Sequence, residues 1–130
     1  MKGPHILVES LKILKQNYEV ELNCDIAGDG EYSMKIERMI NSFGLRGDVR
    51  LSGRIGSEDV GKVLSHLDVF VLPSYSETLS LIILQAMSMG IPVIATGVGG
   101  IPDVMTDGIN GLIVEPGNPF ALAKVIMRVY

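Results

Sequence analysis

The sequence has no tryptophan, a single cysteine and few aromatic residues, which make up 5% of the chain. With Cys24 alone, an internal disulfide is impossible, and its place in an alternating apolar run predicts a small core residue rather than a reactive thiol. The scarcity of aromatics argues against a platform for base stacking. Since the net charge is −4 and the basic residues are scattered, we expect no nucleic acid partner.

Long apolar runs are also missing. No stretch reaches the roughly 18 residues needed to cross a bilayer, and the first residues lack the apolar core of a secretory signal. We therefore expect a cytoplasmic protein, with any contact at the inner membrane face made only through the full-length protein. The 130 residues, 47% of them hydrophobic, are enough for one domain with a well-filled core, residues 1–130.

Helical and strand periods alternate along the chain. Val20, Leu22, Cys24 and Ile26 alternate with polar residues, which predicts a strand. Leu7, Leu11 and Leu14 fall on one helical face, which predicts a helix. By the same patterns we expect helices over residues 4–16, 32–43, 57–67, 78–89, 101–105 and 119–129, and strands over 20–26, 49–51, 69–72, 92–95 and 111–114.

This alternation predicts an α/β fold, a Rossmann-like open parallel sheet with helices on both faces and ligands at the carboxyl ends of its strands. The continuous apolar run at 69–72 predicts a central strand covered on both faces, and the helix at 78–89 is apolar enough to be buried. Because the first element is a helix, the first strand is missing from the usual order. We expect a truncated fragment with a gap in its sheet.

Several ordered motifs cover nearly the whole chain. The main ones are PSYSETLSL at 73–81, QAMSMGIPVIAT at 85–96 and VGGIPDV at 98–104, with AGDG at 27–30, DGINGLIVEPG at 107–117 and KG at 2–3. Together they resemble the carboxyl-terminal signature of the group 1, or family 4, retaining glycosyltransferases.

The resemblance implies that the chain is the carboxyl-terminal, donor-binding half of a GT-B fold, without the N-terminal domain that binds the acceptor. It implies a glycosyltransferase of hexosyltransferase type whose substrate is a nucleoside diphosphate sugar, UDP- or GDP-linked, transferred with retention to a glycan or lipid acceptor. No metal or other cofactor is expected. The isolated fragment is expected to be inactive, and the sugar, base and acceptor stay open.

The resemblance also assigns the site residues. Glu77 matches the first acid of the E-x7-E motif and is the expected catalytic residue, close to the sugar hydroxyls, although a helix N-terminal acid would occupy the same position. Lys2 matches the lysine that contacts the diphosphate, although a solvated terminus would also explain it. We expect a helix that begins at Thr78 and Leu79 to turn free backbone N–H groups toward a phosphate, with Ser80 and Leu81 in the same donor-binding segment.

Gln85 stands where the motif has its second acid, which grips ribose hydroxyls in the family. On one helix, positions 77 and 85 would share a face, and glutamine keeps the acceptor oxygen but loses the charge. Gln85 would also fit a degenerate or specialised member of the family. Gly28 and Gly30 follow the first strand, where ligand approach and a tight turn explain them equally well. Gly99 and Gly100 leave the same choice open.

Other functions stay open. The chain would also suit a nucleotide-sugar-binding module without catalytic activity, or a sugar epimerase of the same architecture, although the run from Glu77 to Asp103 resembles transferases more closely. A different dinucleotide-binding fold is disfavoured because GDGE at 28–31 stops short of the GxGxxG fingerprint. His5 and His66 have no partner at metal-ligand spacing, so no metal site is expected.

Overall fold

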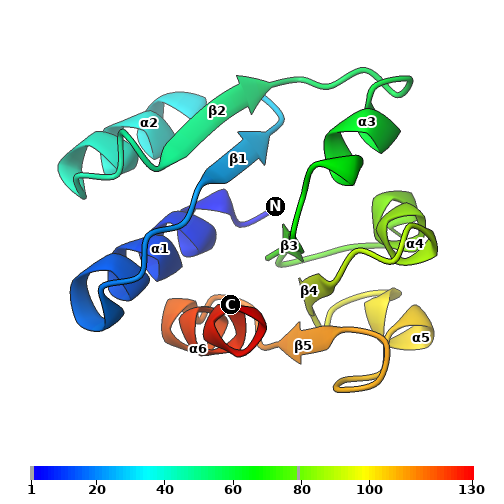
Figure 1. Ribbon diagram of the computed structural model, residues 1–130. Coiled ribbons are helices and arrows are strands. Elements are labelled where there is room, and N and C mark those ends of the chain that lie inside the picture. The colour runs from blue at the N-terminus through cyan, green and yellow to red at the C-terminus, as the bar shows by residue number, and fades with distance from the viewer. Residues whose placement is uncertain (1, 79) are drawn as a thin grey trace.

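The computed structural model describes residues 2–78 and 80–130 of the chain, which alternate between helices and parallel strands (Figure 1). The helices are α1 (Pro4–Tyr18), α2 (Ser33–Ser42), α3 (Val60–Ser65), α4 (Leu81–Ser88), α5 (Ile101–Val104) and α6 (Pro119–Val129). The strands are β1 (Cys24–Ala27), β2 (Val49–Gly53), β3 (Phe70–Leu72), β4 (Val93–Thr96) and β5 (Leu112–Val114). The predicted α/β class and the predicted order of elements are confirmed.

Two hydrophobic cores cover the two faces of the sheet formed by β3, β4 and β5. On β4, Ile94 belongs to a core shared with α1, α2 and α6, whereas Val93 and Ala95 belong to a core shared with α3, α4 and α5. Successive residues of a strand point to opposite faces, which explains this division. Helices therefore lie on both faces here, as predicted.

The sheet is interrupted, as the sequence predicted. In the described residues β1 pairs only with β2, and β3, β4 and β5 form a second sheet in that order. Figure 1 shows the strands in the spatial order β2, β1, β3, β4, β5, with no ladder between β1 and β3. The two sheets are thus joined by side-chain packing and not by backbone hydrogen bonds.

Strand β3 lies in the middle of the strand order (Figure 1), and its side chains pack against both cores, as predicted for residues 69–72. All three residues of β3 are nevertheless partly exposed, because in the described residues the strand pairs only with β4 and borders the interruption. The fully buried strand is β4. By contrast, the β1–β2 sheet is covered on one face only. Its open face carries Asp25 and Arg50, which form an ion pair with 2.7 Å between Nε and Oδ1.

Helix α4 is shorter and less buried than its composition predicts. It begins at Leu81 rather than Thr78, and it buries Ile83 and Ala86 while Leu81 remains 74% exposed. Other bounds also differ, since residues 20–23 lie outside β1 and α3 starts at Val60 rather than at residue 57. By contrast, α6 begins at Pro119 as predicted, and the Asn118 side chain caps it by accepting a hydrogen bond from the N–H of Ala121.

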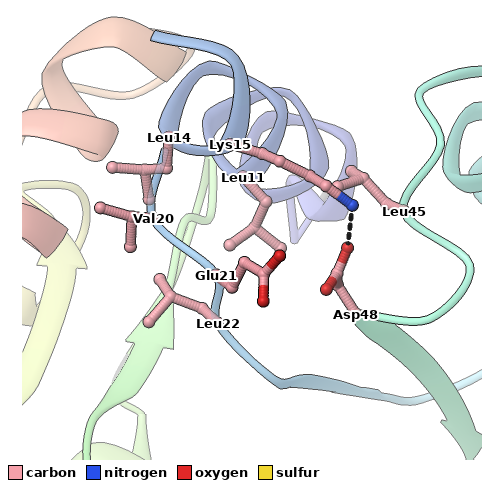
Figure 2. A pocket seen from close by; sticks show the side chains of 8 residues that line it. All are labelled: Leu11, Leu14, Lys15, Val20, Glu21, Leu22, Leu45 and Asp48. Atoms are coloured by element: carbon pink, nitrogen blue, oxygen red, sulfur yellow. Dashed lines mark hydrogen bonds and ion pairs between the residues drawn. The ribbon is translucent and has the colours of Figure 1, made fainter. Parts of the chain in front are cut away.

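Helix α1 connects the two sheets. Its buried side chains, Leu11 and Leu14 among them, belong to the core that contains residues of β1, β2, β4 and β5. Near its end the Lys15 ammonium lies 2.7 Å from Oδ2 of Asp48, the residue before β2 (Figure 2). The same ammonium also donates to the Gly44 carbonyl. The hollow beside this pair has a volume of about 10 Å³, room for one water at most. None of the helices in the described part of the chain has the length and apolarity to cross a membrane.

Cys24 gives a test of the core around β1. Burial, with a smaller contribution from the Asp25 carboxylate, raises the pKa of its thiol to about 12. Because the thiolate is the reactive form, we expect iodoacetamide at about pH 8 to modify the native chain far more slowly than the same chain unfolded in urea, as followed by mass spectrometry. Labelling at equal rates would contradict the core assignment.

Candidate functional site

Lys2 and Glu77 form the centre of the candidate site. The Lys2 ammonium lies 2.8 Å from Oε1 and 2.7 Å from Oε2 of Glu77, across 75 residues of sequence. The Glu77 side chain is 8% exposed, whereas that of Lys2 is 66% exposed. The structure therefore brings together the two charged residues that the sequence analysis selected separately, and it buries only the carboxylate.

Gly3 is the residue that brings Lys2 to this position. It is the N-cap of α1 with φ 68°, followed by Pro4 in the first turn. A Cβ at Gly3 would overlap the carbonyl oxygen of Pro73 in the loop after β3. A residue without a side chain thus lets the start of α1 contact the β3–α4 loop, and Lys2 reaches Glu77 from there.

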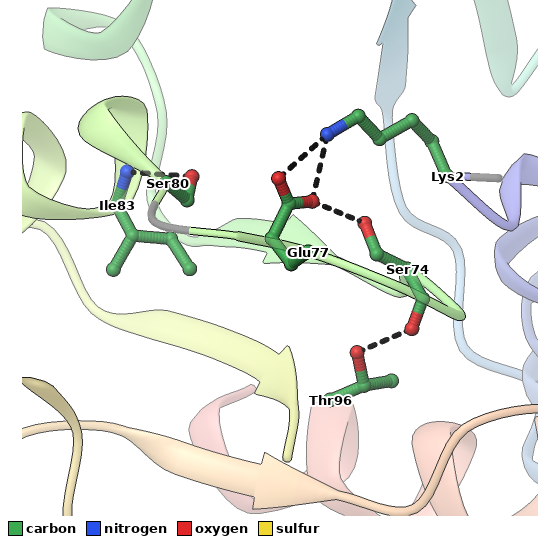
Figure 3. A network of polar contacts seen from close by, with 6 residues as sticks. All are labelled: Lys2, Ser74, Glu77, Ser80, Ile83 and Thr96. Carbon is green, nitrogen blue, oxygen red and sulfur yellow. Dashed lines mark hydrogen bonds and ion pairs between the residues drawn. The ribbon is translucent and has the colours of Figure 1, made fainter. Parts of the chain in front are cut away.

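Two buried hydroxyls continue the network behind Glu77 (Figure 3). The Ser74 hydroxyl donates to Oε2 of Glu77 at 2.9 Å, and the Thr96 hydroxyl donates to the Ser74 carbonyl at 2.5 Å. Ser74 is 0% exposed and Thr96 is 1% exposed. Since Thr96 ends the buried strand β4, the network connects the carboxylate to the centre of the sheet.

The backbone of the same loop rests on the loop after β4. Gly99 has φ 56°, and a Cβ there would overlap the carbonyl oxygen of Glu77. The N–H of Gly100 donates to the carbonyl of Thr78 at 2.7 Å. These contacts explain why glycines occupy positions 99 and 100, because the two loops at the carboxyl ends of β3 and β4 approach each other closely there.

Glu77 is held in its charged form. Burial raises the pKa of its carboxyl, but the hydrogen bonds from Lys2 and Ser74 and the charge of Lys2 outweigh burial, so the pKa lies below its usual range. A carboxylate that keeps its charge while largely buried is suited to accept hydrogen bonds from hydroxyl groups.

The expected start of a helix at Thr78 is wrong. Thr78 is exposed and lies in the loop, and α4 begins at Leu81 because Ser80 is its N-cap, with the Ser80 hydroxyl accepting from the N–H of Ile83 at 3.4 Å. Both residues are of the type that caps helices, and only the packing selects Ser80. The first N–H groups of the helix therefore belong to Leu81 and Ile82. Leu79, the other expected donor of an N–H group, lies outside the described residues.

Gln85 and the two glycines after β1 lie apart from this network. Because Glu77 precedes α4, the expectation that positions 77 and 85 share a helical face is wrong. Gln85 is exposed, and its side chain lies next to Gly61 of α3. A Cβ added at Gly61 would be 3.3 Å from the amide nitrogen of Gln85. Gly28 and Gly30 are exposed in the turn after β1, where the N–H of Gly28 donates to the Gly53 carbonyl at 2.7 Å.

Three residues of the site had no assigned role in the sequence analysis. Ser74, Tyr75 and Thr96 all lie within the quoted motifs, and this position was the only signal that pointed to them. The Tyr75 ring stacks on His5 with 5.7 Å between ring centroids. The ring also lies close to Gly117, where an added Cβ would be 3.2 Å from a ring carbon of Tyr75. Tyr75 therefore packs between the start of α1 and the β5–α6 loop.

Two hollows in the surface are lined by residues other than Lys2 and Glu77. One of them has a volume of about 430 Å³ and is lined mainly by residues 90–93 and 108–112, at the starts of β4 and β5. It lies at the opposite end of these strands from the site. Among residues 2–78 and 80–130 there is no group of three or more His, Cys, Asp or Glu side chains that would hold a metal ion.

Gly99→Ala tests the contact between the two loops. Its Cβ would overlap the Glu77 carbonyl, whereas Gly90→Ala places a Cβ at a similar φ of 73° with nothing within 4 Å. We expect Gly90→Ala to cost about 1 kcal/mol of unfolding free energy from backbone strain, and Gly99→Ala to cost clearly more. Urea denaturation measures both. Equal costs would contradict the close approach.

Lys2→Gln tests the ion pair. Removing the ammonium should raise the pKa of Glu77 above its value in the unchanged chain, measured by NMR titration of the side-chain carboxyl. Because the folded-state pKa is lowered, the ionised Glu77 stabilises the fold above its ordinary pKa, and this contribution is lost as the pH falls through the lowered value. Lys2→Gln should therefore reduce the loss of stability in acid. The control is Lys124→Gln, which removes an exposed lysine of α6 and should leave the Glu77 titration unchanged.

Comparison with known proteins gives the family. The model for glycosyl transferases group 1 matches residues 1–130. An uncharacterized glycosyltransferase of Methanocaldococcus jannaschii is 32% identical over 127 residues, 98% of this chain and 34% of the relative. A D-inositol 3-phosphate glycosyltransferase of Paenarthrobacter aurescens is 30% identical over 133 residues, 100% of this chain and 33% of the relative. The chain thus spans about a third of the length of these curated relatives.

Solved structures agree with this result. HepE of Anabaena in complex with UDP-glucose superposes with a TM-score of 0.87 at 28% identity, over 98% of this chain and 35% of HepE. The C-terminal domain of LpcC, a group 1 family protein of Francisella tularensis, gives a TM-score of 0.85 at 25% identity, over 98% of this chain and 68% of that domain. From the sequence match over its full length and the shared fold, we conclude that the chain belongs to the group 1 glycosyltransferases, which have the GT-B fold.

Proposed function

We propose that residues 1–130 form the donor-binding domain of a glycosyltransferase and bind a nucleoside diphosphate sugar. The observation that carries this proposal is the pairing of Lys2 with the largely buried carboxylate of Glu77 beside the carboxyl ends of β3 and β4. Ligands of open α/β sheets bind at this end of the strands. A cation and a carboxylate side by side match the two parts of such a ligand, its diphosphate and its sugar.

In the proposed mechanism Lys2 and Glu77 contact different parts of the sugar donor. The bond between the anomeric carbon and the diphosphate breaks, a bond to the acceptor hydroxyl oxygen forms with retained configuration, and the hydroxyl proton is released. Negative charge grows on the diphosphate as it leaves, and Lys2 with the N–H groups of Leu81 and Ile82 at the start of α4 stabilises that charge. Glu77 accepts hydrogen bonds from the sugar hydroxyls and orients the ring.

The comparisons support a uridine nucleotide. Structures of HepE that superpose on this chain contain UDP, UDP with glucose, and UDP-glucose. We propose that the sugar donor is UDP-linked and that an N-terminal domain outside this chain binds a glycan or lipid acceptor. On this view no metal is needed, because protein groups balance the charge of the diphosphate, and the 130 residues alone bind the sugar donor without transferring its sugar.

Gln85 favours a second candidate, a module that binds nucleotide sugars without catalysis. It replaces the second acid of the E-x7-E motif, and its exposed amide lies beside Gly61 of α3. An amide oxygen accepts weaker hydrogen bonds from ribose hydroxyls than a charged carboxylate does. Sugar transfer by the full-length protein separates the candidates, because the module would bind the nucleotide sugar without turnover.

Calorimetric titration with UDP, GDP and ADP, each alone and as its glucose conjugate, tests the proposal. We expect UDP and UDP-glucose to bind. Glu77→Ala should weaken only UDP-glucose, by about tenfold for the loss of charge-assisted hydrogen bonds. Gln85→Glu should strengthen both uridine ligands, since a carboxylate would again face the ribose. If a folded chain binds none of the six ligands, the proposal is wrong for these 130 residues.

A further inference from the structure

We infer that Ser74 and Thr96 are positioning residues that fix the carboxylate of Glu77 and leave its Oε1 as the oxygen that accepts hydrogen bonds from the donor sugar. The identity of the ligand in this inference rests on the proposed function. The hydrogen bonds among Thr96, Ser74 and Glu77 are seen in the structure itself (Figure 3).

The two oxygens of Glu77 differ in how many hydrogen bonds they receive from the protein. Oε2 accepts from Lys2 at 2.7 Å and from Ser74 at 2.9 Å, whereas Oε1 accepts only from Lys2, at 2.8 Å. Each carboxylate oxygen offers about two acceptor sites. Oε2 is therefore occupied by the protein, and Oε1 keeps a site for a ligand hydroxyl.

The hydroxyl of Ser74 donates its hydrogen bond to Oε2 of Glu77. Ser74 is 0% exposed and has one O–H group, which points at Glu77, so water does not compete for it. Its carbonyl accepts the hydroxyl of Thr96 at 2.5 Å. Thr96 is 1% exposed at the end of β4, the strand covered on both faces, so the position of Ser74 is set by the most buried part of the sheet.

The other partner of Glu77 is free to leave. The side chain of Lys2 is 66% exposed. A solvent-exposed ammonium is held less strongly by its partner than a buried one, because water screens its charge. When Lys2 turns to a diphosphate, Ser74 still holds Oε2, and the backbone of Glu77 still rests against Gly99. The carboxylate thus keeps its orientation while its counter-charge passes to the ligand.

Ser74→Ala tests the inference in the full-length protein, with Ser10→Ala as the matched control. Ser10 is also 0% exposed, and its hydroxyl donates to the Leu7 carbonyl within α1, away from Glu77. We expect Ser74→Ala to weaken UDP-glucose binding by about tenfold and to leave UDP binding unchanged, since a lost hydrogen bond to a charged group has an effect of that size. Ser10→Ala should change neither affinity.

Thr96→Val and Thr96→Ser form a second pair. Valine has the shape of threonine without the hydroxyl, whereas serine keeps the hydroxyl. We expect Thr96→Val to weaken the binding of UDP-glucose relative to that of UDP. Thr96→Ser should keep the ratio of the two affinities at its value in the unchanged protein. This pair decides the question if Ser74→Ala does not fold.

The pKa of Glu77 in the ligand-free protein, measured by NMR titration, is the readout that a merely structural role would not move. It should rise in Ser74→Ala and in Thr96→Val, and stay unchanged in Ser10→Ala and Thr96→Ser. If the affinity ratio and the pKa both stay unchanged in Ser74→Ala, the positioning role is overturned. If UDP-glucose does not bind the unchanged protein, the proposed function and the role toward the sugar both fail, while a shifted pKa would still show that Ser74 holds Glu77.

Discussion

The burial of helix α1 against both sheets is the interaction on which the rest of the structure depends. No backbone hydrogen bond joins β1 to β3 in the described residues, so the sheets keep their relative position through side chains. Leu11 and Leu14 of α1 pack in the core that contains residues of both sheets, and Lys15 pairs with Asp48 before β2. Apolar burial is non-directional, and here directional contacts at the two ends of the helix fix its position.

The same helix sets the geometry of the site. Lys2 precedes α1 directly, and Gly3 lets the start of the helix contact Pro73. A change that shifted α1 would therefore move the cation relative to Glu77 without touching the site. The carboxylate does not depend on α1 in this way, because the loop after β4 and the hydroxyl of Ser74 hold it. The site thus combines a carboxylate fixed by the sheet with a cation supplied by the helix.

This division suits the proposed function. On that proposal, the donor sugar needs a fixed carboxylate to accept hydrogen bonds from its hydroxyls, because misplacement reduces the rate steeply. The proposed leaving diphosphate would gain charge, and an exposed lysine on a flexible stem can follow it. Tyr75, stacked on His5 and close to Gly117, packs the start of α1 against two loops and so limits how far Lys2 can move.

The α/β class, the order of the elements and the family could all be predicted from the sequence, because they depend on local periodicity and on motifs in fixed order. The same motifs led us to select Lys2 and Glu77 as candidate site residues. The sequence did not determine that β4 rather than β3 is the buried strand, since both have the same apolar pattern and only strand pairing separates them. It placed the start of α4 at Thr78, because Thr78 and Ser80 are both capping residues and only the packing of the loop against Gly99 and Gly100 selects Ser80. The contacts of Lys2 with Glu77 and of Thr96 with the Ser74 carbonyl depend on the tertiary structure, because contacts across 75 and 22 residues leave no local signal in a single sequence.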